Sequence, residues 1–330
     1  MNVFELTRQL IDTPSVTGDE LAVGDFLARH LEQLGYRVER QEVASDRFNV
    51  IAATEVPPRV VFSTHMDTVP PFIESSEDEE FIYGRGSCDA KGIMAAQIFA
   101  AQRLRNKGVN DVGLLFTVDE ELGSLGAQAA NKHPLAASCR FLINGEPTDS
   151  RLATGTKGSV RLIITTEGRA AHSAYPEAGE SAIEKLLDIL DDIRACKWPE
   201  DSFFGTTTCN IGVLNGGTRP NVIADKARAE LQIRLGIDIE HVKSVLDEVA
   251  GTRGRLEYNS AHNPVRLFSV PGFDECVVRF TTDVPYLSQW GKPLLLGPGS
   301  ILVAHTDHER ISKRELADAV DLYVSLAKKL

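Results

Sequence analysis

The sequence is poor in cysteine and contains no long apolar run. Its five cysteines are an odd number and none is spaced as Cys-x-x-Cys, which argues against a disulfide framework and favours a reducing cytoplasm. The first residues, Met1–Leu6, have neither a basic start nor a long apolar core, so we expect no signal peptide and no membrane span. Internal repeats and low-complexity tracts are also absent.

Positive charge is scarce as well. The chain has 35 Lys and Arg against 47 Asp and Glu, and this net charge of −12 argues against nucleic acid as a partner. Acidic stretches such as Glu74–Glu80 are typical of a solvated surface. At 330 residues the chain exceeds the usual limit of about 250–300 residues for a single core, so we expect two domains.

What the sequence does contain is an imidazole and a carboxylate directly after an apolar, β-prone run. His65 and Asp67 follow Val60–Thr64 and stand two residues apart. Side chains at i and i+2 of an extended segment point to the same face, so Asp67 could accept the outer N–H of His65 while the other ring nitrogen faces a metal. Taken alone, the pair fits a buried polar contact better, and the interpretation needs further ligands.

Further acids and a second imidazole appear downstream, mostly after apolar runs. They are Asp89 in the glycine-rich turn Gly84–Gly92 before a helix, Asp119–Glu121 after the strand-like Leu114–Val118, Glu146 after the strand-like Phe141–Ile143, and His305 after Ser300–Ala304, which we expect to be a strand. In open α/β sheets, ligands bind at the carboxyl ends of strands. The pattern therefore predicts one shared site.

The donor types indicate the chemistry of that site. Oxygen and nitrogen ligands without a thiolate suit zinc, cobalt or manganese. The count fits two metals if Asp89 bridges them, and it leaves Glu120 or Glu121 free to act as a base. A solvated acidic turn is the alternative for Asp119–Glu121, but the apolar strand before it and Gly123 after it favour the site. Paired metals that activate water and polarise a carbonyl are typical of aminopeptidases and amide hydrolases.

Seven motifs extend this interpretation over nearly the whole chain. In order they read STHMDTVPP, YGRGSCDAKGIMAAQ, FTVDEELGSLGA, NGEPT, GRAAHSAYPEAGESAI, NVIADKARAELQIR and LGPGSILVAHTDHE. The chain resembles the dizinc aminoacylase and carboxypeptidase family, which includes acetylornithine deacetylase, succinyl-diaminopimelate desuccinylase, carboxypeptidase G and the bacterial di- and tripeptidases.

The resemblance assigns roles to the predicted ligands and base. It implies that two divalent metals, zinc first and cobalt or manganese as alternatives, are held by His65 and Glu146 on one side and by Glu121 and His305 on the other, with Asp89 between them. Glu120 becomes the general base, and Asp67 the partner of His65. His308 competes with His305, which matches the AHT position of the family. The family also implies a cis peptide bond after Asp89.

The resemblance further implies residues that contact the substrate. His172 would stabilise the oxyanion, and in dimeric members this histidine comes from the neighbouring subunit. Asn221 and Arg234 match the substrate-side asparagine and arginine, and a guanidinium suits a substrate carboxylate. Thr282 and Gly299 would complete the pocket wall. A surface histidine and a structural salt bridge are the alternatives for His172 and Arg234.

The predicted fold is α/β, with a zinc-peptidase-like catalytic domain interrupted by an α+β, ferredoxin-like lid or dimerisation domain. The strand-then-acid pattern stops near Gly155–Gly158, where a β-α-β-β-α-β order begins. Its strands are expected at Ser159–Gly168, Thr206–Val213, Lys226–Leu235 and Arg255–Tyr258, and its helices at Ser181–Ala195 and Glu240–Ala250. The catalytic domain is then 1–156 and 268–330, with strands at Val277–Thr282 and Pro293–Leu296, and the inserted domain is 157–267.

These observations predict a cytoplasmic, metal-dependent hydrolase that cleaves the amide bond of an N-acyl amino acid. The GEPT and GRGSCDAKG segments most resemble acetylornithine and acetyl-lysine deacetylases. A di- or tripeptidase or carboxypeptidase of the same family is the alternative. A non-catalytic binding protein is disfavoured because every ligand and the base are present. The expected partners are a small N-acyl amino acid or short peptide and a second copy of the chain, with neither nucleic acid nor membrane.

Overall fold

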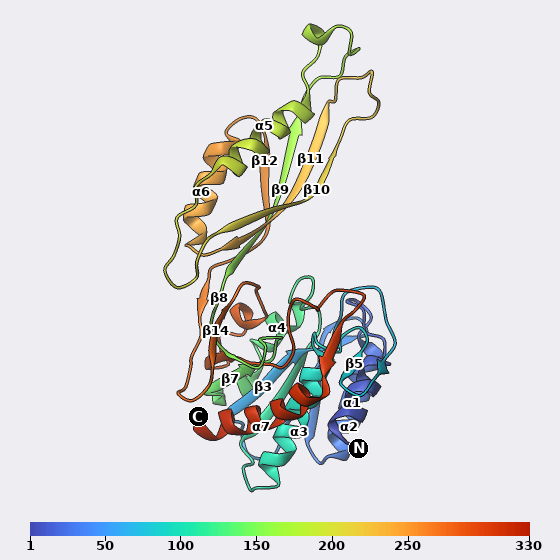
Figure 1. The fold of residues 1–330 in the computed structure, drawn as a ribbon, viewed down its shortest axis with the longest axis vertical. Helices are drawn as coiled ribbons and strands as arrows, with labels where there is room; N and C mark the ends of the chain where they lie inside the picture. Colours follow the sequence, from blue (N-terminus) through green and yellow to red (C-terminus); the bar gives the residue numbers. More distant parts are fainter. The chain divides into compact units, whose positions relative to one another are not determined.

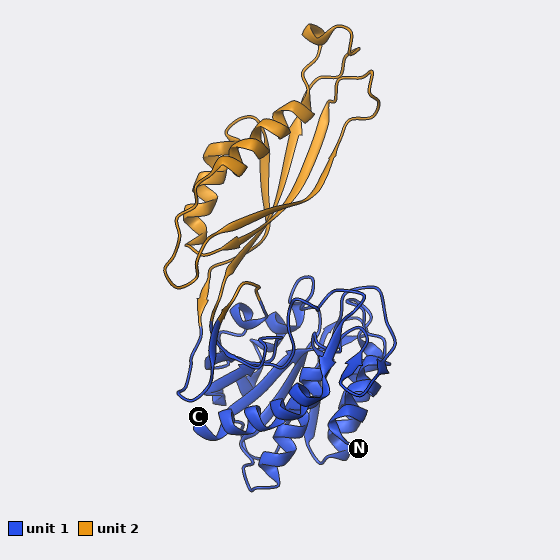
Figure 2. Cartoon of the chain, in the orientation of Figure 1, with its two compact units in different colours: residues 1–154, 267–276, 282–330 blue, residues 155–266, 277–281 orange.

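The computed structural model describes residues 1–330, which form two compact units. The first unit comprises Met1–Thr154, Leu267–Cys276 and Thr282–Leu330, and the second comprises Gly155–Arg266 and Val277–Thr281 (Figure 2). Most of the second unit is thus one insertion into the first, and a short later segment returns to it. None of the helices combines the length and the apolar character that a membrane span requires.

A nine-stranded mixed sheet is the centre of the first unit (Figure 1). Its strand order is β1-β2-β6-β3-β7-β15-β8-β13, with β14 beside β8. The strands are β1 Arg37–Ala44, β2 Arg47–Ala53, β3 Val60–His65, β6 Val112–Thr117, β7 Phe141–Asn144, β8 Leu152–Thr156, β13 Val265–Arg266, β14 Glu275–Val278 and β15 Lys292–Leu295. Strands β6, β3, β7 and β15 are parallel neighbours, so their carboxyl ends lie at one edge. Of the strands in this sheet, only β13 and the ends of β8 and β14 belong to the second unit.

Helices cover both faces of this sheet, which explains why its central strands are apolar throughout. Along β3, Val60 and Phe62 enter the core on one face and Val61 the core on the other, as alternation in a strand requires. One face carries α1 Val3–Ile11, α2 Leu21–Gln33, α3 Lys91–Arg105 and α7 Lys313–Lys329. The other carries α4 Leu125–Ala130 and the short 3₁₀ turns η1 Pro134–Ser138 and η3 Val284–Tyr286. A small sheet of β16 Arg310–Ser312, β5 Phe81–Tyr83 and β4 Ser76–Glu77 completes the unit.

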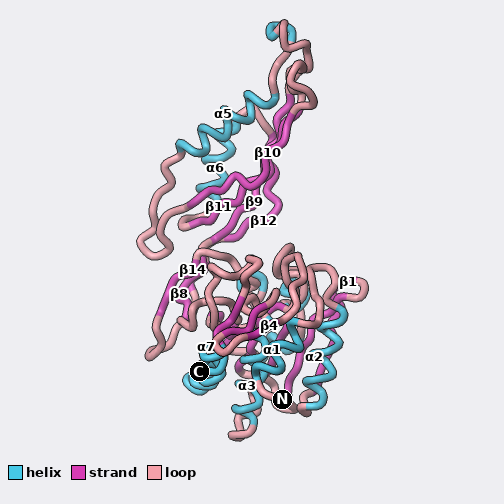
Figure 3. Tube along the Cα trace, turned by 45° about the vertical axis from the view of Figure 1, so that its right-hand side comes forward, coloured by secondary structure: helices cyan, strands magenta, loops and turns pink.

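The second unit is a four-stranded antiparallel sheet in the order β10-β11-β9-β12, with two helices packed on one face (Figures 1 and 3). Its elements are β9 Gly158–Glu167, η2 Pro176–Ala178, α5 Ala182–Ala195, β10 Thr208–Gly216, β11 Lys226–Leu235, α6 Ile239–Ala250 and β12 Arg255–His262. In β11, alternate residues from Ala227 to Leu235 are buried against the helices. The α/β class predicted for the chain is confirmed. The β-α-β-β-α-β order predicted for the second unit is confirmed as well.

The segment before His305 departs from the prediction. We expected a strand over Ser300–Ala304, but the chain forms a turn there, closed by the N–H of Val303 donating to the carbonyl of Ser300 at 3.1 Å. The apolar residues of this segment do not enter a sheet, and Leu302 is 84% exposed. The strands expected at 277–282 and 293–296 are shifted to β14 and β15, which lie one to four residues earlier.

Candidate metal and catalytic centre

The site residues of the first unit come from the carboxyl ends of adjacent parallel strands. His65 ends β3, and in the register of the sheet it lies beside Thr117, the last residue of β6. Glu120 and Glu121 follow β6, while Glu146 follows β7, the other neighbour of β3. The sheet topology therefore explains why acids from distant parts of the sequence lie close together.

Two imidazoles and two carboxylates form the centre of this cluster. The Nε2 atom of His65 lies 3.0 Å from Oδ1 of Asp89, and Nε2 of His305 lies 3.3 Å from Oδ2 of Asp89. His305 Nε2 is also 3.0 Å from Oε1 of Glu121. Asp89 thus stands between both histidines, and ligand atoms of His65, Asp89 and Glu121 lie within 4.8 Å of one another. His308 makes no contact of this kind.

Glu146 has an oxygen that no donor of the cluster reaches. Its side chain is buried, and its Oε1 atom has no hydrogen-bond partner although buried polar atoms are almost always paired. Burial raises the pKa of Glu146 well above its usual value, and His65 opposes this shift. A divalent cation would remove the mutual repulsion of Asp89, Glu121 and Glu146 and would satisfy that oxygen. The residues therefore fit a metal centre.

The two glutamates after β6 differ in their contacts. Glu121 contacts His305, whereas the carboxylate of Glu120 makes no hydrogen bond or ion pair. Burial, and next the charge of Glu146, raise the pKa of Glu120 well above its ordinary value. Burial alone would also raise the pKa of Asp89, but hydrogen bonds with His305 and His65 outweigh it and hold that pKa low. Glu120 is thus a carboxylate without a hydrogen-bond or ion-pair partner and with a raised affinity for protons.

Asp67 contacts the centre differently from our expectation. The partner of His65 Nδ1 is the backbone carbonyl of Asp67 at 2.9 Å, and the carboxylate lies farther away, at 3.5 Å. The carboxylate oxygens instead accept the backbone N–H groups of Glu120 at 3.1 Å and Glu121 at 3.2 Å, and the hydroxyl of Thr17 at 2.9 Å. The chain turns so sharply after β6 that these N–H groups face Asp67. Asp67 therefore holds the turn that presents the two glutamates.

Backbone conformation contributes at two ligands. The peptide bond between Asp89 and Ala90 is cis, as the resemblance implied. His305 adopts φ +63°, in the left-handed region that few residues other than glycine enter, and its side chain is 47% exposed. Hydrogen bonds to Asp89 and Glu121 raise the pKa of His305 to about 10, and burial opposes them. His305 is the most exposed imidazole of the centre.

Two buried carboxylates beside the centre were missed by the sequence analysis. Asp283 accepts the hydroxyl of Thr117 at 2.8 Å, and its Oδ1 atom has no partner. Burial raises the pKa of Asp283 to about 6. Glu309, which follows His305 by four residues, is also buried and pairs with Arg85. Asp283 follows a predicted strand, so the same strand-then-acid rule could have found it; no such signal marks Glu309.

The second unit carries three of the predicted substrate residues. His172 is exposed, and its Nδ1 atom accepts the N–H of Ala174 at 3.2 Å, which leaves Nε2 as the protonated nitrogen of the neutral ring. Exposed Asn221 is tied to the same segment, since its carbonyl accepts the N–H of Ser173 at 3.1 Å. Arg234 donates to the hydroxyl of Thr281 at 3.1 Å. Their contribution to the active site remains a prediction.

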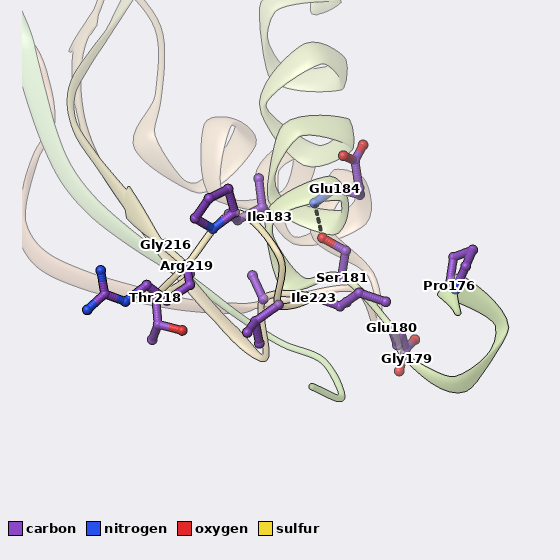
Figure 4. Close-up of a pocket in the computed structure, with 14 residues that line it drawn as sticks. Pro176, Gly179, Glu180, Ser181, Ile183, Glu184, Gly216, Thr218, Arg219 and Ile223 are labelled. Atoms are coloured by element: carbon purple, nitrogen blue, oxygen red, sulfur yellow. Dashed lines mark hydrogen bonds between the residues drawn. The ribbon is translucent and has the colours of Figure 1, made fainter. Parts of the chain in front are cut away.

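A cavity of about 680 Å³ lies in the second unit, between the start of α5 and the loop of residues 216–224. Figure 4 shows the residues that line it. Its charged side chains, among them Glu180, Glu184 and Arg219, are exposed. Ser181 is half-buried but already accepts the N–H of Glu184 as the N-cap of α5. The cavity offers no buried polar group to a ligand, so we assign it no function.

Thr282 and Gly299 have structural roles within the first unit. The hydroxyl of buried Thr282 accepts the N–H of Val284 at 3.1 Å and thereby begins the turn η3. Gly299 has φ +82°, and a Cβ atom there would lie 2.6 Å from the sulfur of Cys88. These contacts explain the residue types without a substrate, and substrate binding by either residue remains a prediction.

Comparison with known proteins places the chain in a family. Residues 61–329 match the model of Peptidase family M20/M25/M40. A protein of Aspergillus niger named "Probable carboxypeptidase" is 38% identical over 97% of this chain and 87% of its own length. The name of that relative favours the peptidase alternative, and nothing in the comparisons supports acetylornithine deacetylase in particular.

Solved structures show the same fold. An M20 metallo-carboxypeptidase from Sulfolobus solfataricus has a TM-score of 0.80 at 18% identity and covers 99% of each chain. A dinuclear metal-binding M20 peptidase from Bacillus subtilis has a TM-score of 0.70 at 15% identity, covering 99% of this chain and 98% of its own. The strand-end cluster, the fold and the family match lead to one conclusion: the chain belongs to peptidase family M20/M25/M40.

Proposed function

We propose that the protein is a metal-dependent peptidase that removes a residue from short peptides, most simply as a carboxypeptidase. The observation that carries this proposal is the cluster of Asp89, Glu121 and Glu146 with two imidazoles, in which Glu146 Oε1 has no partner. The carboxylate of Glu120 lies close to this cluster, since the charge of Glu146 helps to raise its pKa. The name of the fungal relative supports a carboxypeptidase over a deacetylase. Hydrolysis of N-acyl amino acids is the second candidate, because it needs the same amide chemistry.

The residues of the first unit would hold two divalent ions. We assign one ion to His65 and Glu146 and the other to Glu121 and His305, with Asp89 shared. All the donors are oxygen or nitrogen, which suits zinc, and cobalt or manganese are the alternatives. When bound, the ions would make a water molecule more acidic and would polarise the carbonyl of the scissile amide.

Glu120 supplies the proton transfers of the reaction. Its carboxylate takes a proton from the attacking water and then returns it to the departing amine, which leaves as a neutral group. The side chain of Glu120 carries the proton between these two steps, and burial, which raises its pKa, supports this role. The N–H groups of Glu120 and Glu121 donate to Asp67, and this fixes the direction in which the base points.

The second unit would contribute substrate recognition. Because the Nδ1 atom of His172 is occupied by Ala174, its Nε2–H group is the donor we assign to the developing oxyanion. Asn221 and Arg234 would bind the polar end of the substrate, the guanidinium suiting a terminal carboxylate. Thr282 and Gly299 would lie at the pocket wall of the first unit.

We also propose that the enzyme is a homodimer joined through β10. This strand is an edge of the four-stranded sheet, and its side chains are exposed, including apolar Val213 and Leu214. An unpaired edge strand can pair with its own copy across a two-fold axis. The cytoplasmic location remains a prediction from the cysteine content.

A substrate panel tests the proposed function. The metal-reconstituted protein would be assayed with a dipeptide, the same dipeptide with an amidated carboxyl terminus, its N-acetyl form, and N-acetylornithine. A carboxypeptidase loses the amidated substrate and retains the N-acetyl one, whereas a deacetylase prefers N-acetylornithine. A chelator and the Glu120→Gln variant serve as controls. Hydrolysis that resists both would contradict the metal-dependent mechanism.

A further inference from the structure

Glu309 gathers more hydrogen-bond donors than any other carboxylate described above. Its side chain is fully buried, and one oxygen, Oε1, accepts three backbone N–H groups, those of Gly86 at 3.0 Å, Cys88 at 3.1 Å and Asp89 at 3.0 Å. The other oxygen accepts Nη1 of Arg85 at 2.7 Å. Four donors from one loop thus converge on a single anion.

The shape of the loop is what makes this convergence possible. Gly86 has φ +87°, a conformation that L side chains rarely adopt, and a Cβ atom there would lie 2.9 Å from the side chain of Lys91. With this backbone, successive N–H groups point to the same side, which is the arrangement of an anion-binding nest. Here the anion is a side chain of the protein itself, so the nest fixes the loop instead of binding a ligand.

Glu309 also belongs to the segment that carries His305. Arg85, which pairs with Glu309, donates a second hydrogen bond to the carbonyl of Thr306 at 3.1 Å. The carbonyl of Glu309 accepts the N–H of Gly84 at 3.2 Å, and β16 then pairs with β5. The loop before α3 and the segment after His305 are therefore linked by both side-chain and backbone hydrogen bonds.

These two segments each supply one predicted ligand of the same ion. The N–H of Asp89 donates directly to Glu309, and His305 lies 3.3 Å from the Asp89 carboxylate. The turn that carries His305 is itself largely at the surface, since Leu302 is exposed and the imidazole is half-exposed. The fully buried Glu309 thus provides a connection between the segments of the two ligands, in addition to the contact of the Cys88 thiol with the carbonyl of Ser300 at 3.4 Å.

We propose that Glu309, with Arg85, is a positioning residue that sets the separation of Asp89 and His305 and so determines the affinity of the site for its second ion. The inference rests on the proposed function, because it assumes that the cluster binds metal. Glu309 touches neither the metal nor the substrate in this account. It acts through the backbone N–H of Asp89 and through the segment that carries His305.

The test is the Glu309→Gln variant, with metal affinity as the readout. A glutamine oxygen can still accept the three N–H groups. The NH2 group of the glutamine would then face the guanidinium of Arg85, and because both groups are donors, they could not form a hydrogen bond. We expect the dissociation constant of the weaker zinc site, measured by competition with a chromophoric chelator, to rise about 10–100-fold. This is the usual effect of replacing a residue that supports a metal ligand. At saturating zinc, kcat should return to within a few-fold of the unaltered enzyme.

A core variant separates positioning from general stability. Leu27→Ala removes a fully buried side chain of α2 and should lower the melting temperature without altering zinc affinity. If Glu309→Gln and Leu27→Ala had the same zinc affinity, Glu309 would be only a structural residue and the inference would be overturned. Wild-type protein that binds no divalent ion would instead overturn the proposed function itself, so the two failures are distinguishable.

A second variant covers the case in which Glu309→Gln does not fold. Arg85→Lys keeps the charge and one donor for Glu309 but cannot also reach the carbonyl of Thr306. The expected result is a smaller rise, about three- to tenfold, in the dissociation constant of the weaker zinc site. Unchanged zinc affinity in folded Arg85→Lys would reject the role of the Arg85–Glu309 pair.

Discussion

The two units of the chain hold their polar residues in opposite ways. In the first, Asp67, Asp89 and Glu309 are at most 5% exposed, and each is held by hydrogen bonds from other segments. In the second, His172 and Asn221 are exposed, and each is held by a single backbone N–H group, that of Ala174 for the imidazole and that of Ser173 for the carbonyl of Asn221. Buried and cross-linked groups keep one geometry, which bond-making chemistry requires, whereas exposed groups can adapt to a ligand. We therefore expect the first unit to supply the metal ligands and the base, and the second to contact the substrate, including its developing oxyanion.

Loss of the base, Glu120, should have the largest effect and is the most direct test of this assignment. Glu120→Gln is expected to lower kcat by a factor of about 10²–10⁴, because proton transfer to and from the reacting groups is lost. Metal content should stay unchanged, since the Glu120 carboxylate contacts no histidine. Steady-state kinetics and metal analysis measure the two quantities.

Glu121→Gln is the matched control for that variant, and it should lose metal. If Glu120→Gln lost about one metal equivalent while Glu121→Gln retained both, the roles of the two glutamates would have to be exchanged.

The second prediction tests whether an exposed residue can contribute to chemistry. His172→Ala should lower kcat about 10²–10³-fold if its Nε2–H group stabilises the oxyanion. In a homodimer with shared sites, an equal mixture with Glu120→Gln should recover about a quarter of full activity, because half of the dimers are mixed and each has one intact site. No recovery after verified subunit exchange, or a fully active monomer, would place each His172 in its own chain's site.

Asp67→Asn tests whether a buried carboxylate of the first unit holds the turn that carries Glu120 and Glu121. The amide oxygen can accept only one of the two N–H groups that now donate to the carboxylate, so the turn of Glu120 and Glu121 should loosen. We expect metal affinity or activity to fall about 10–100-fold. Thr17→Val, which removes only the hydroxyl donor to Asp67, is the control and should have a smaller effect. Equal effects of both substitutions would contradict the role of Asp67 in holding the turn.

The smallest effect concerns the pH dependence of stability in metal-free protein. The pKa of Asp283 is raised from 3.8 to about 6, so the folded state binds this proton more tightly than the unfolded state. The resulting stabilisation is present below about pH 4 and is lost as the pH rises through 6, an effect of about 1–3 kcal/mol. Asp283→Asn should flatten this dependence in denaturant titrations between pH 4 and 7. An unchanged slope would show that Asp283 ionises normally.

Much of the first unit could be predicted because its central strands obey a simple rule. Parallel strands end at one edge, so an acid after each apolar run indicates a shared site, and this rule brought together His65, Glu121 and Glu146. Burial on both faces made these strands apolar and easy to locate. In the second unit, the strand expected at Lys226–Leu235 has the same limits as β11.

The remaining contacts depend on backbone conformations that side-chain patterns do not report. Asp119, Ser124 and His305 all have positive φ, and the turns they form decide which N–H groups face Asp67 and where the second imidazole lies. The apolar run over Ser300–Ala304 predicted a strand and forms an exposed turn. Glu309 could not be assigned either, because its partners are main-chain groups of a loop far away in the sequence.

The position of β15 has a consequence for how the protein is made. This strand lies between β7 and β8, although the whole second unit is synthesised before it. While the chain emerges from the ribosome, the edge of β7 that pairs with β15 therefore remains unpaired until residues 292–295 have been synthesised. His305 follows later still, so the proposed set of ligands is incomplete until residue 305 has been synthesised. We therefore expect the centre to bind both ions only after His305 has reached it.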